Sequence, residues 1–178
     1  NGGGQLGDGT TTNKTSPVQI KQGTKFTQVS AGSNHSMAID SKGNLWTWGN
    51  NYYGQLGDGT TTNKTSLIQI KAGIRFIQIS AGGGYSLAID SNGDVWTWGA
   101  NYYGQLGDGT TTNKISPVQI KQGTKFTQVS AGYNHSMAID SKENLWTWGN
   151  NNNGQLGDGT TTNKTSPVQI KQGTKFTQ

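Results

Sequence analysis

Short apolar segments alternate with turn-forming residues along the whole chain. Within one stretch of about fifty residues, four segments carry apolar or β-branched residues bounded by turn residues, which is the pattern of short β-strands. These segments are FTQVSAG at 26–32, HSMAID at 35–40, NLWTWG at 44–49 and a fourth that reads LIQI at 67–70 and PVQI at 117–120. No segment has the periodicity of an amphipathic helix, so the pattern predicts an all-β chain.

The strand pattern repeats with a period of 50 residues, which aligns Trp46 with Trp96 and Trp146. Repeats of this length are typical of solenoids and propellers, and four short strands in each repeat match the radial sheet, or blade, of a β-propeller. The small residues at 30–32 suit an innermost strand, where neighbouring blades crowd the axis. Trp46 and Trp48 share one face of their strand and are expected to pack against the next blade.

The order of the strands predicts three complete blades, at about 26–70, 76–120 and 126–170. An extra outer strand is expected at 17–20, and a stub at 175–178 begins a further blade. Residues 1–178 are therefore predicted to form a single partial β-propeller, roughly half a ring. An open arc would expose the apolar faces of its terminal blades, so we expect two chains to associate as a homodimer that closes a ring of six blades. A longer chain would allow seven.

A glycine-rich segment, GQLGDGTTTNKT, recurs at 4–15, 54–65, 104–115 and 154–165 with one change, Ile115 in place of threonine. Its Lys-Thr ending suggests a phosphate-binding loop, but such a loop needs glycine where Asp8 and Asn13 stand. We predict instead that the segment joins the third strand of each blade to the outermost one. Its tight turn would lie at 7–9, and Gln5 and Leu6 would insert at a blade boundary.

The residues that usually carry catalysis are scarce. Cysteine is absent, and the two histidines, His35 and His135, are too far apart in sequence for a local metal motif. His35, Ser36 and Asp40 do not form a triad, because neighbours on a strand point to opposite faces. A structural histidine near the channel is expected instead. The sequence therefore predicts no catalytic residue, no metal site and no cofactor, and the protein is not expected to be an enzyme.

The net charge of +5 comes almost wholly from lysine, with Arg75 the single arginine. Asparagine and threonine dilute this charge, which favours a solubility role over a nucleic-acid surface. No stretch approaches the roughly 18 apolar residues of a membrane span. Neither nucleic acid nor a membrane is therefore expected as a partner.

Four spaced motifs resemble the repeat of the regulator of chromosome condensation family: GQLG-x-G, P-V, V-x-A-G-x-x-H-S-x-A and G-x-L-x-x-W-G. The resemblance covers essentially the whole chain. It implies a seven-bladed propeller and surface recognition, which in that family includes guanine-nucleotide exchange on a small GTPase, chromatin binding and the capping of β-lactamases. The exchange activity depends on family-specific loops that have no match in this chain.

Positions that differ among the repeats are the candidate contact residues. Exposed tyrosines at loop tips give a large contact area at low entropic cost, whereas neutral variation in tolerant loops is the alternative explanation. The predicted partner-binding residues are Tyr52, Tyr53, Tyr102, Tyr103 and Tyr133.

These residues predict a noncatalytic β-propeller scaffold that binds a protein partner, as yet unknown, and closes its ring by self-association. Two other functions stay open. One is a regulator of an enzyme, either a GTPase exchange factor or an enzyme inhibitor, and the other is a carbohydrate-binding propeller with aromatic platforms.

Overall fold

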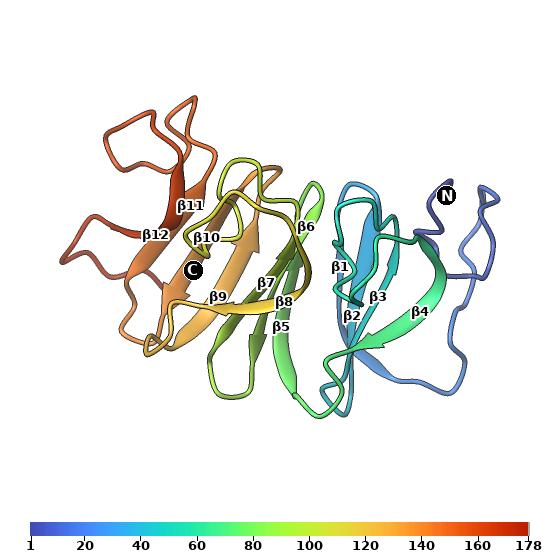
Figure 1. Ribbon diagram of the computed structural model, residues 1–178. Coiled ribbons are helices and arrows are strands. Elements are labelled where there is room, and N and C mark those ends of the chain that lie inside the picture. Colours follow the sequence, from blue (N-terminus) through green and yellow to red (C-terminus); the bar gives the residue numbers. More distant parts are fainter. Residues whose placement is uncertain (178) are drawn as a thin grey trace.

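The computed structural model describes residues 1–177 and contains three antiparallel four-stranded sheets (Figure 1). The first sheet comprises β1 (Phe26–Ala31), β2 (His35–Asp40), β3 (Leu45–Gly49) and β4 (Lys64–Ile70). The second comprises β5 (Phe76–Ala81), β6 (Tyr85–Asp90), β7 (Val95–Gly99) and β8 (Lys114–Ile120). The third comprises β9 (Phe126–Ala131), β10 (His135–Asp140), β11 (Leu145–Gly149) and β12 (Lys164–Ile170). The all-β fold of four-stranded blades is confirmed.

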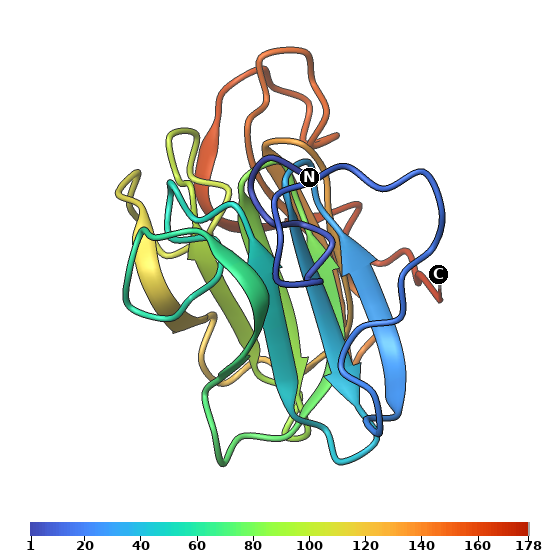
Figure 2. The same ribbon diagram turned by 90° about the vertical axis from the view of Figure 1, so that its right-hand side faces the viewer.

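Each sheet is a meander in which every strand pairs with the next strand in the chain. The sheets stand face to face, so that from the first-sheet end they lie one behind another (Figure 2). The strand β5 contacts both β1 and β9, and these three strands form the inner edge of the arc. Their small residues allow this approach, because the Ser30 hydroxyl accepts a hydrogen bond from the Ala81 amide at 3.0 Å and Ser80 accepts one from Ala131 at 2.9 Å.

The apolar core lies between neighbouring sheets. Met37, Ile39 and Leu45 of the first sheet pack against Phe76 and Trp98 of the second, among other residues. An equivalent cluster joins the second sheet to the third and contains Leu87, Ile89, Phe126 and Trp148. The first and second blades thus complete their cores with residues of the next blade.

The tryptophans pack against the preceding sheet, which corrects the expectation that they face the next one. Trp98 belongs to the cluster shared with the first sheet, and Trp148 to the cluster shared with the second. Successive residues of a strand point to opposite faces. Leu45 and its equivalents take the face toward the following sheet, so the tryptophans are left with the other face.

The extra outer strand expected at 17–20 is not formed, and residues 175–177 of the expected stub also form no strand. Gln178 lies outside the described residues. Within residues 1–177 neither segment lies beside a strand of its own blade, and a ladder requires such a partner. Near the first of them, an isolated bridge joins Asp8 to Ser66. The described residues contain no helix able to span a membrane.

Candidate functional site

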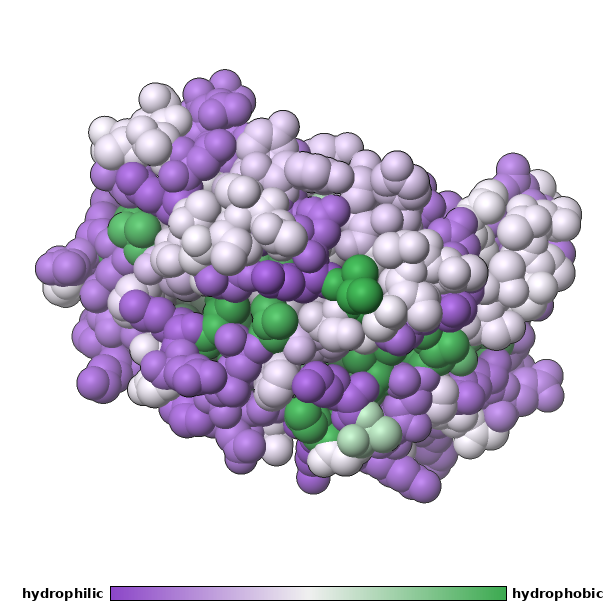
Figure 3. Space-filling view, viewed as in Figure 1, coloured by the Kyte–Doolittle hydropathy of each residue, from purple (hydrophilic) through white to green (hydrophobic). Residues whose placement is uncertain are grey.

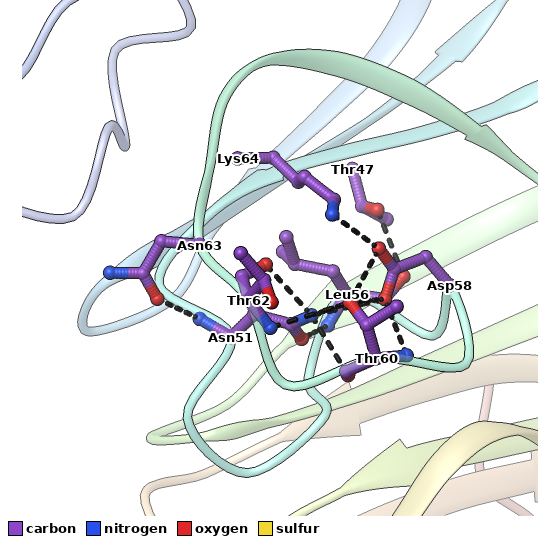
Figure 4. Close-up of polar contacts among 8 residues, drawn as sticks. All are labelled: Thr47, Asn51, Leu56, Asp58, Thr60, Thr62, Asn63 and Lys64. Atoms are coloured by element: carbon purple, nitrogen blue, oxygen red, sulfur yellow. Dashed lines mark hydrogen bonds and ion pairs between the residues drawn. The ribbon is translucent and has the colours of Figure 1, made fainter.

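The loops between the third and fourth strands share one internal architecture, built around a buried asparagine. In the loop between β3 and β4, the Asn51 side chain donates hydrogen bonds to the Asp58 carboxylate at 3.0 Å and to the carbonyls of Thr60 and Thr62 (Figure 4). Its side-chain oxygen accepts the Leu56 amide at 2.9 Å. The loop is therefore held in one conformation by a single side chain.

The same network surrounds Asn101 and Asn151. These asparagines were not among the residues predicted from the sequence, although one recurs at the same place in every repeat. That recurrence is the sequence signal for these asparagines. An asparagine that only favours a turn could stand at different positions in different repeats.

Asp58 stabilises the far side of this loop. Partial burial alone would raise its pKa, but hydrogen bonds from Thr60, Lys64 and Asn51 outweigh burial and hold the pKa below its ordinary value. The Lys64 ammonium lies 3.1 Å from the carboxylate. Asp8, Asp108 and Asp158 are paired in the same way with the lysine six residues later.

The loops after β3 and β7 each dock on the following sheet through one backbone carbonyl. The Gln55 carbonyl accepts hydrogen bonds from the Trp98 indole at 2.8 Å and from the Ser86 hydroxyl at 2.8 Å. A Cβ atom at Gly57 would lie 2.8 Å from the same indole nitrogen, so glycine is required there. The predicted insertion of this segment at a blade boundary is confirmed.

We call the end of the arc that carries these loops, together with the turns that follow β1, β5 and β9, the loop rim. Three predicted tyrosines form a continuous row on it. The ring centroids of Tyr52 and Tyr53 are 4.9 Å apart, and those of Tyr53 and Tyr102 are 5.7 Å apart, both in edge-to-face geometry. Tyr52 and Tyr102 are exposed, whereas Tyr53 is half-buried. We refer to these three residues as the tyrosine row.

Tyr133 joins this row indirectly. Two of the three glycines in the turn between β5 and β6 lie close to these tyrosine rings: a Cβ atom at Gly84 would be 3.0 Å from the Tyr53 ring, and one at Gly83 would be 3.0 Å from the Tyr133 ring. Tyr103 is half-buried and has no stacked aromatic partner within residues 1–177. The structure thus brings together four of the five predicted residues.

A shallow depression of about 350 Å³ opens beside Tyr133, at the loop-rim end of the inner strands. Small residues line it, among them Ala31, Ala81 and Gly82. Elsewhere, apolar residues on the face seen in Figure 1 form small groups separated by polar ones (Figure 3).

His35 and its equivalent Tyr85 link neighbouring sheets. The fully buried His35 ring lies 2.9 Å from the Ser86 hydroxyl of the second sheet, and burial lowers its pKa to about 4. In the second sheet, Tyr85 replaces the histidine and donates to the His135 carbonyl. Asp40 is engaged elsewhere, because it accepts the Trp46 indole N–H at 3.0 Å. The expected structural histidine is confirmed.

Charge is divided unequally between the two rims. On the loop rim, four aspartates pair with four lysines and cancel. The strand registers place residues 20–26, 40–45 and 70–76 together at the opposite end, which we call the hairpin rim. This rim carries ten basic and five acidic residues, and hence the whole net charge of +5. Among residues 1–177, no cluster of histidine and acidic side chains has the composition to hold a metal ion.

A family model of the RCC1-like domain matches residues 1–178. The chain belongs to the RCC1-like domain family. The resemblance indicated by the sequence motifs is therefore confirmed. A comparison with curated protein sequences gave no match.

Solved structures similar to this RCC1-like chain include human WBSCR16, with 25% identity and a TM-score of 0.84 over 95% of this chain. Yeast RCC1 (Prp20) bound to Kap60 has 23% identity and a TM-score of 0.75 over 82%. Prp20p from Saccharomyces cerevisiae has 24% identity and a TM-score of 0.72 over 82%. At those identities the yeast structures show the fold alone. The chain spans 46%, 37% and 38% of these proteins, less than half of each.

Proposed function

We propose that this RCC1-like chain is a noncatalytic scaffold that binds a protein partner through the loop rim and closes its ring by self-association. The tyrosine row carries the proposal. Its rings stand on loops that are already rigid, so little conformational entropy is lost when a partner packs against them. The charges around it are paired, which favours contact with an uncharged, partly apolar protein surface.

The terminal faces of the arc support self-association. Val29 of β1 is 77% exposed, whereas its equivalents Ile79 and Val129 are 8% and 7% exposed because a preceding sheet covers them. At the other end, a groove of about 380 Å³ is lined by residues that include Met137, Ile139 and Leu145. The equivalent residues of the first sheet are buried beneath the second. Two chains joined head to tail would cover both faces.

The native mass of the purified chain across a concentration series tests self-association. We expect a dimer near twice 18.9 kDa at high concentration. A chain that stays monomeric at every concentration would contradict ring closure by two copies.

Partner binding is tested with the immobilised chain and a cell extract. Proteins retained by the wild type should be lost from a variant that combines Tyr52→Ser and Tyr102→Ser. They should be retained by Val18→Ser, which removes an exposed apolar side chain outside the tyrosine row. Retention that is indifferent to the tyrosines would reject the tyrosine row as the binding surface.

The enzyme-regulator alternative is supported by family membership. The similar yeast protein Prp20p has been studied for its binding to Gsp1p and histones. A carbohydrate-binding role is supported by Tyr133 beside the depression at the inner strands. Binding to a glycan array that is lost in Tyr133→Ala would favour that role over the scaffold.

A further inference from the structure

Within residues 1–177, the fourth copy of the glycine-rich loop docks on no neighbouring sheet. Residues 154–165 are identical in sequence to residues 4–15. A Cβ atom at Gly4 would lie 2.7 Å from Thr65, and one at Gly7 would lie 2.8 Å from the Trp48 indole, which shows how closely that copy is docked. At Gly154 and Gly157 an added Cβ atom would meet nothing within 4 Å. The surface that the other copies use for docking is thus uncovered on the fourth loop.

This free loop already has the bound conformation. Asn151 donates to the Asp158 carboxylate at 3.1 Å and to the Thr160 carbonyl at 2.9 Å, as Asn51 and Asn101 do in the docked loops. The φ angle of Gly157 is 69°, close to the 77° of Gly57. Because the loop is preorganised, docking would require little reordering.

The site that this loop would fit is on the first sheet, where the chain's own N-terminal copy occupies it. The Gln5 carbonyl accepts the Trp48 indole N–H at 2.8 Å and the Ser36 hydroxyl at 2.9 Å. These are the same contacts that Gln55 makes with the second sheet. The Gly9 amide also donates to the Thr65 carbonyl at 2.9 Å.

The N-terminal copy is held less firmly than the other docked copies. Leu6 is 40% exposed, whereas Leu56 and Leu106 are fully buried. In the loop after β3, the Thr47 hydroxyl anchors the Leu56 carbonyl at 2.9 Å, and Leu6 has no third strand of its own blade to supply such a bond. The free loop lacks this weakness, because the Thr147 hydroxyl donates to the Leu156 carbonyl at 2.9 Å and Leu156 is buried. Exchange would therefore replace a loosely anchored loop with one that its own sheet already holds.

We propose that residues 1–15 are an intramolecular cap on the Trp48 face of the first sheet, and that loop 154–165 of a second copy replaces this cap when two chains associate head to tail. The proposal rests on the self-association proposed above. The exchange is neutral in charge, because the Asp8–Lys14 pair is replaced by the Asp158–Lys164 pair. In the same step Val29 would enter the groove beside Met137 of the other copy.

At the other end of the molecule, the C-terminal segment occupies the place that residues 21–28 of a second copy would take. Residues 171–178 repeat the sequence of residues 21–28. The Phe176 amide donates to the Glu143 carbonyl at 2.9 Å, just as Phe76 donates to Gly43 at 2.9 Å. Phe176 lines the groove that contains Met137. A second copy's Phe26 would therefore displace Phe176, as its first sheet accepts the free loop.

A matched pair of glycine variants tests the exchange. Gly7→Val and Gly157→Val introduce the same side chain at nearly the same φ, 72° and 69°, so the local strain is equal. Valine at position 7 collides with Trp48 and releases the cap, whereas valine at position 157 contacts nothing until a second copy docks. We expect Gly7→Val to lower the dimer dissociation constant about tenfold or more and Gly157→Val to raise it at least as much, since each removes two hydrogen bonds from one docked state.

Sedimentation velocity gives the dissociation constants, and hydrogen exchange of the wild type supplies a readout that needs no variant. On dimerisation, amides in 1–15 should exchange faster and those in 154–165 more slowly. A wild-type dimer whose association is unchanged by both variants would overturn cap exchange and leave self-association standing. Monomers throughout would overturn both.

Discussion

Glu143 occupies a backbone conformation that the other repeats assign to glycine. In the turn after the second strand of each sheet, Gly43 and Gly93 have φ angles of 83° and 80°, and Glu143 has 65°. A side chain in this left-handed region costs about 1–2 kcal/mol because its Cβ approaches the carbonyl oxygen. The third sheet therefore contains one strained residue that the others avoid.

Replacing this residue with glycine should stabilise the protein. We expect Glu143→Gly to raise the free energy of unfolding by about 1 kcal/mol, slightly less than the strain itself because glycine also loosens the unfolded chain. Urea denaturation measures the change, and Gly93→Glu is the reciprocal control, expected to lower stability. A fall in stability for Glu143→Gly would refute the strain argument.

His35 should make stability depend on pH. Its folded-state pKa of about 4 lies below its ordinary value of 6.5, because burial disfavours the charged ring. The unfolded chain then binds more protons between these values, so stability falls as the pH drops from 6.5 toward 4, by about 1.4 kcal/mol per pH unit. Urea denaturation at pH 7, 5.5 and 4.5 measures how the free energy of unfolding changes with pH.

The control variant for this pH dependence is His35→Tyr, because tyrosine occupies the equivalent position in the second sheet, at Tyr85. This variant should lose most of the slope between pH 6.5 and 4 while His135 is retained. An unchanged slope would assign the pH dependence to other groups.

At the scale of elements, the loop before the fourth strand depends on one buried amide. Asn151 is fully buried and bonds to Asp158, Thr160, Thr162 and Leu156, whereas the neighbouring Asn152 is exposed. A side chain with several partners leaves all of them unsatisfied when it is removed.

We expect Asn151→Ala to lower the free energy of unfolding by about 3 kcal/mol and Asn152→Ala to change it by less than about 0.5 kcal/mol. The two variants differ by one position in the same loop, so they separate the buried network from any general effect of the loop. Thermal or urea denaturation gives both values. Equal effects would mean that the loop does not depend on Asn151.

At the scale of the whole molecule, the two rims have different electrostatic character. The net charge lies on the hairpin rim, while the charges of the loop rim and of the docking loops are paired. Exposed charges farther apart than about 8 Å are screened at physiological salt, so unpaired lysines would make association depend on ionic strength. Head-to-tail association through the docking loops adds no unpaired charge.

The dimer dissociation constant should therefore change less than about threefold between 0.1 and 0.5 M salt. Sedimentation across a salt series measures it, and a single-stranded oligonucleotide serves as a comparison ligand. Any binding of that ligand to the hairpin rim should weaken steeply with salt. A dimer that dissociates steeply with salt would contradict an interface of paired charges.

The sequence by itself determined the repeat, the all-β class, the four strands of each blade and the family. These features depend on local alternation, on turn residues and on motifs that recur every 50 residues, so they can be read without knowing what packs where. It also identified the tyrosines as the variable loop positions. It placed most strand ends within one residue, as at 35–40, where prediction and structure coincide.

The tertiary structure alone decided three further features. The tryptophans face the preceding sheet because the stacking of sheets, and not alternation, selects between two equivalent faces. Residues 17–20 form no strand because a ladder needs a partner, and no strand within residues 1–177 lies beside them as one. Tyr53 contacts Tyr102, 49 residues away in sequence, because the spacing between neighbouring blades sets the distance between their loops. The sequence of a single repeat does not contain that spacing.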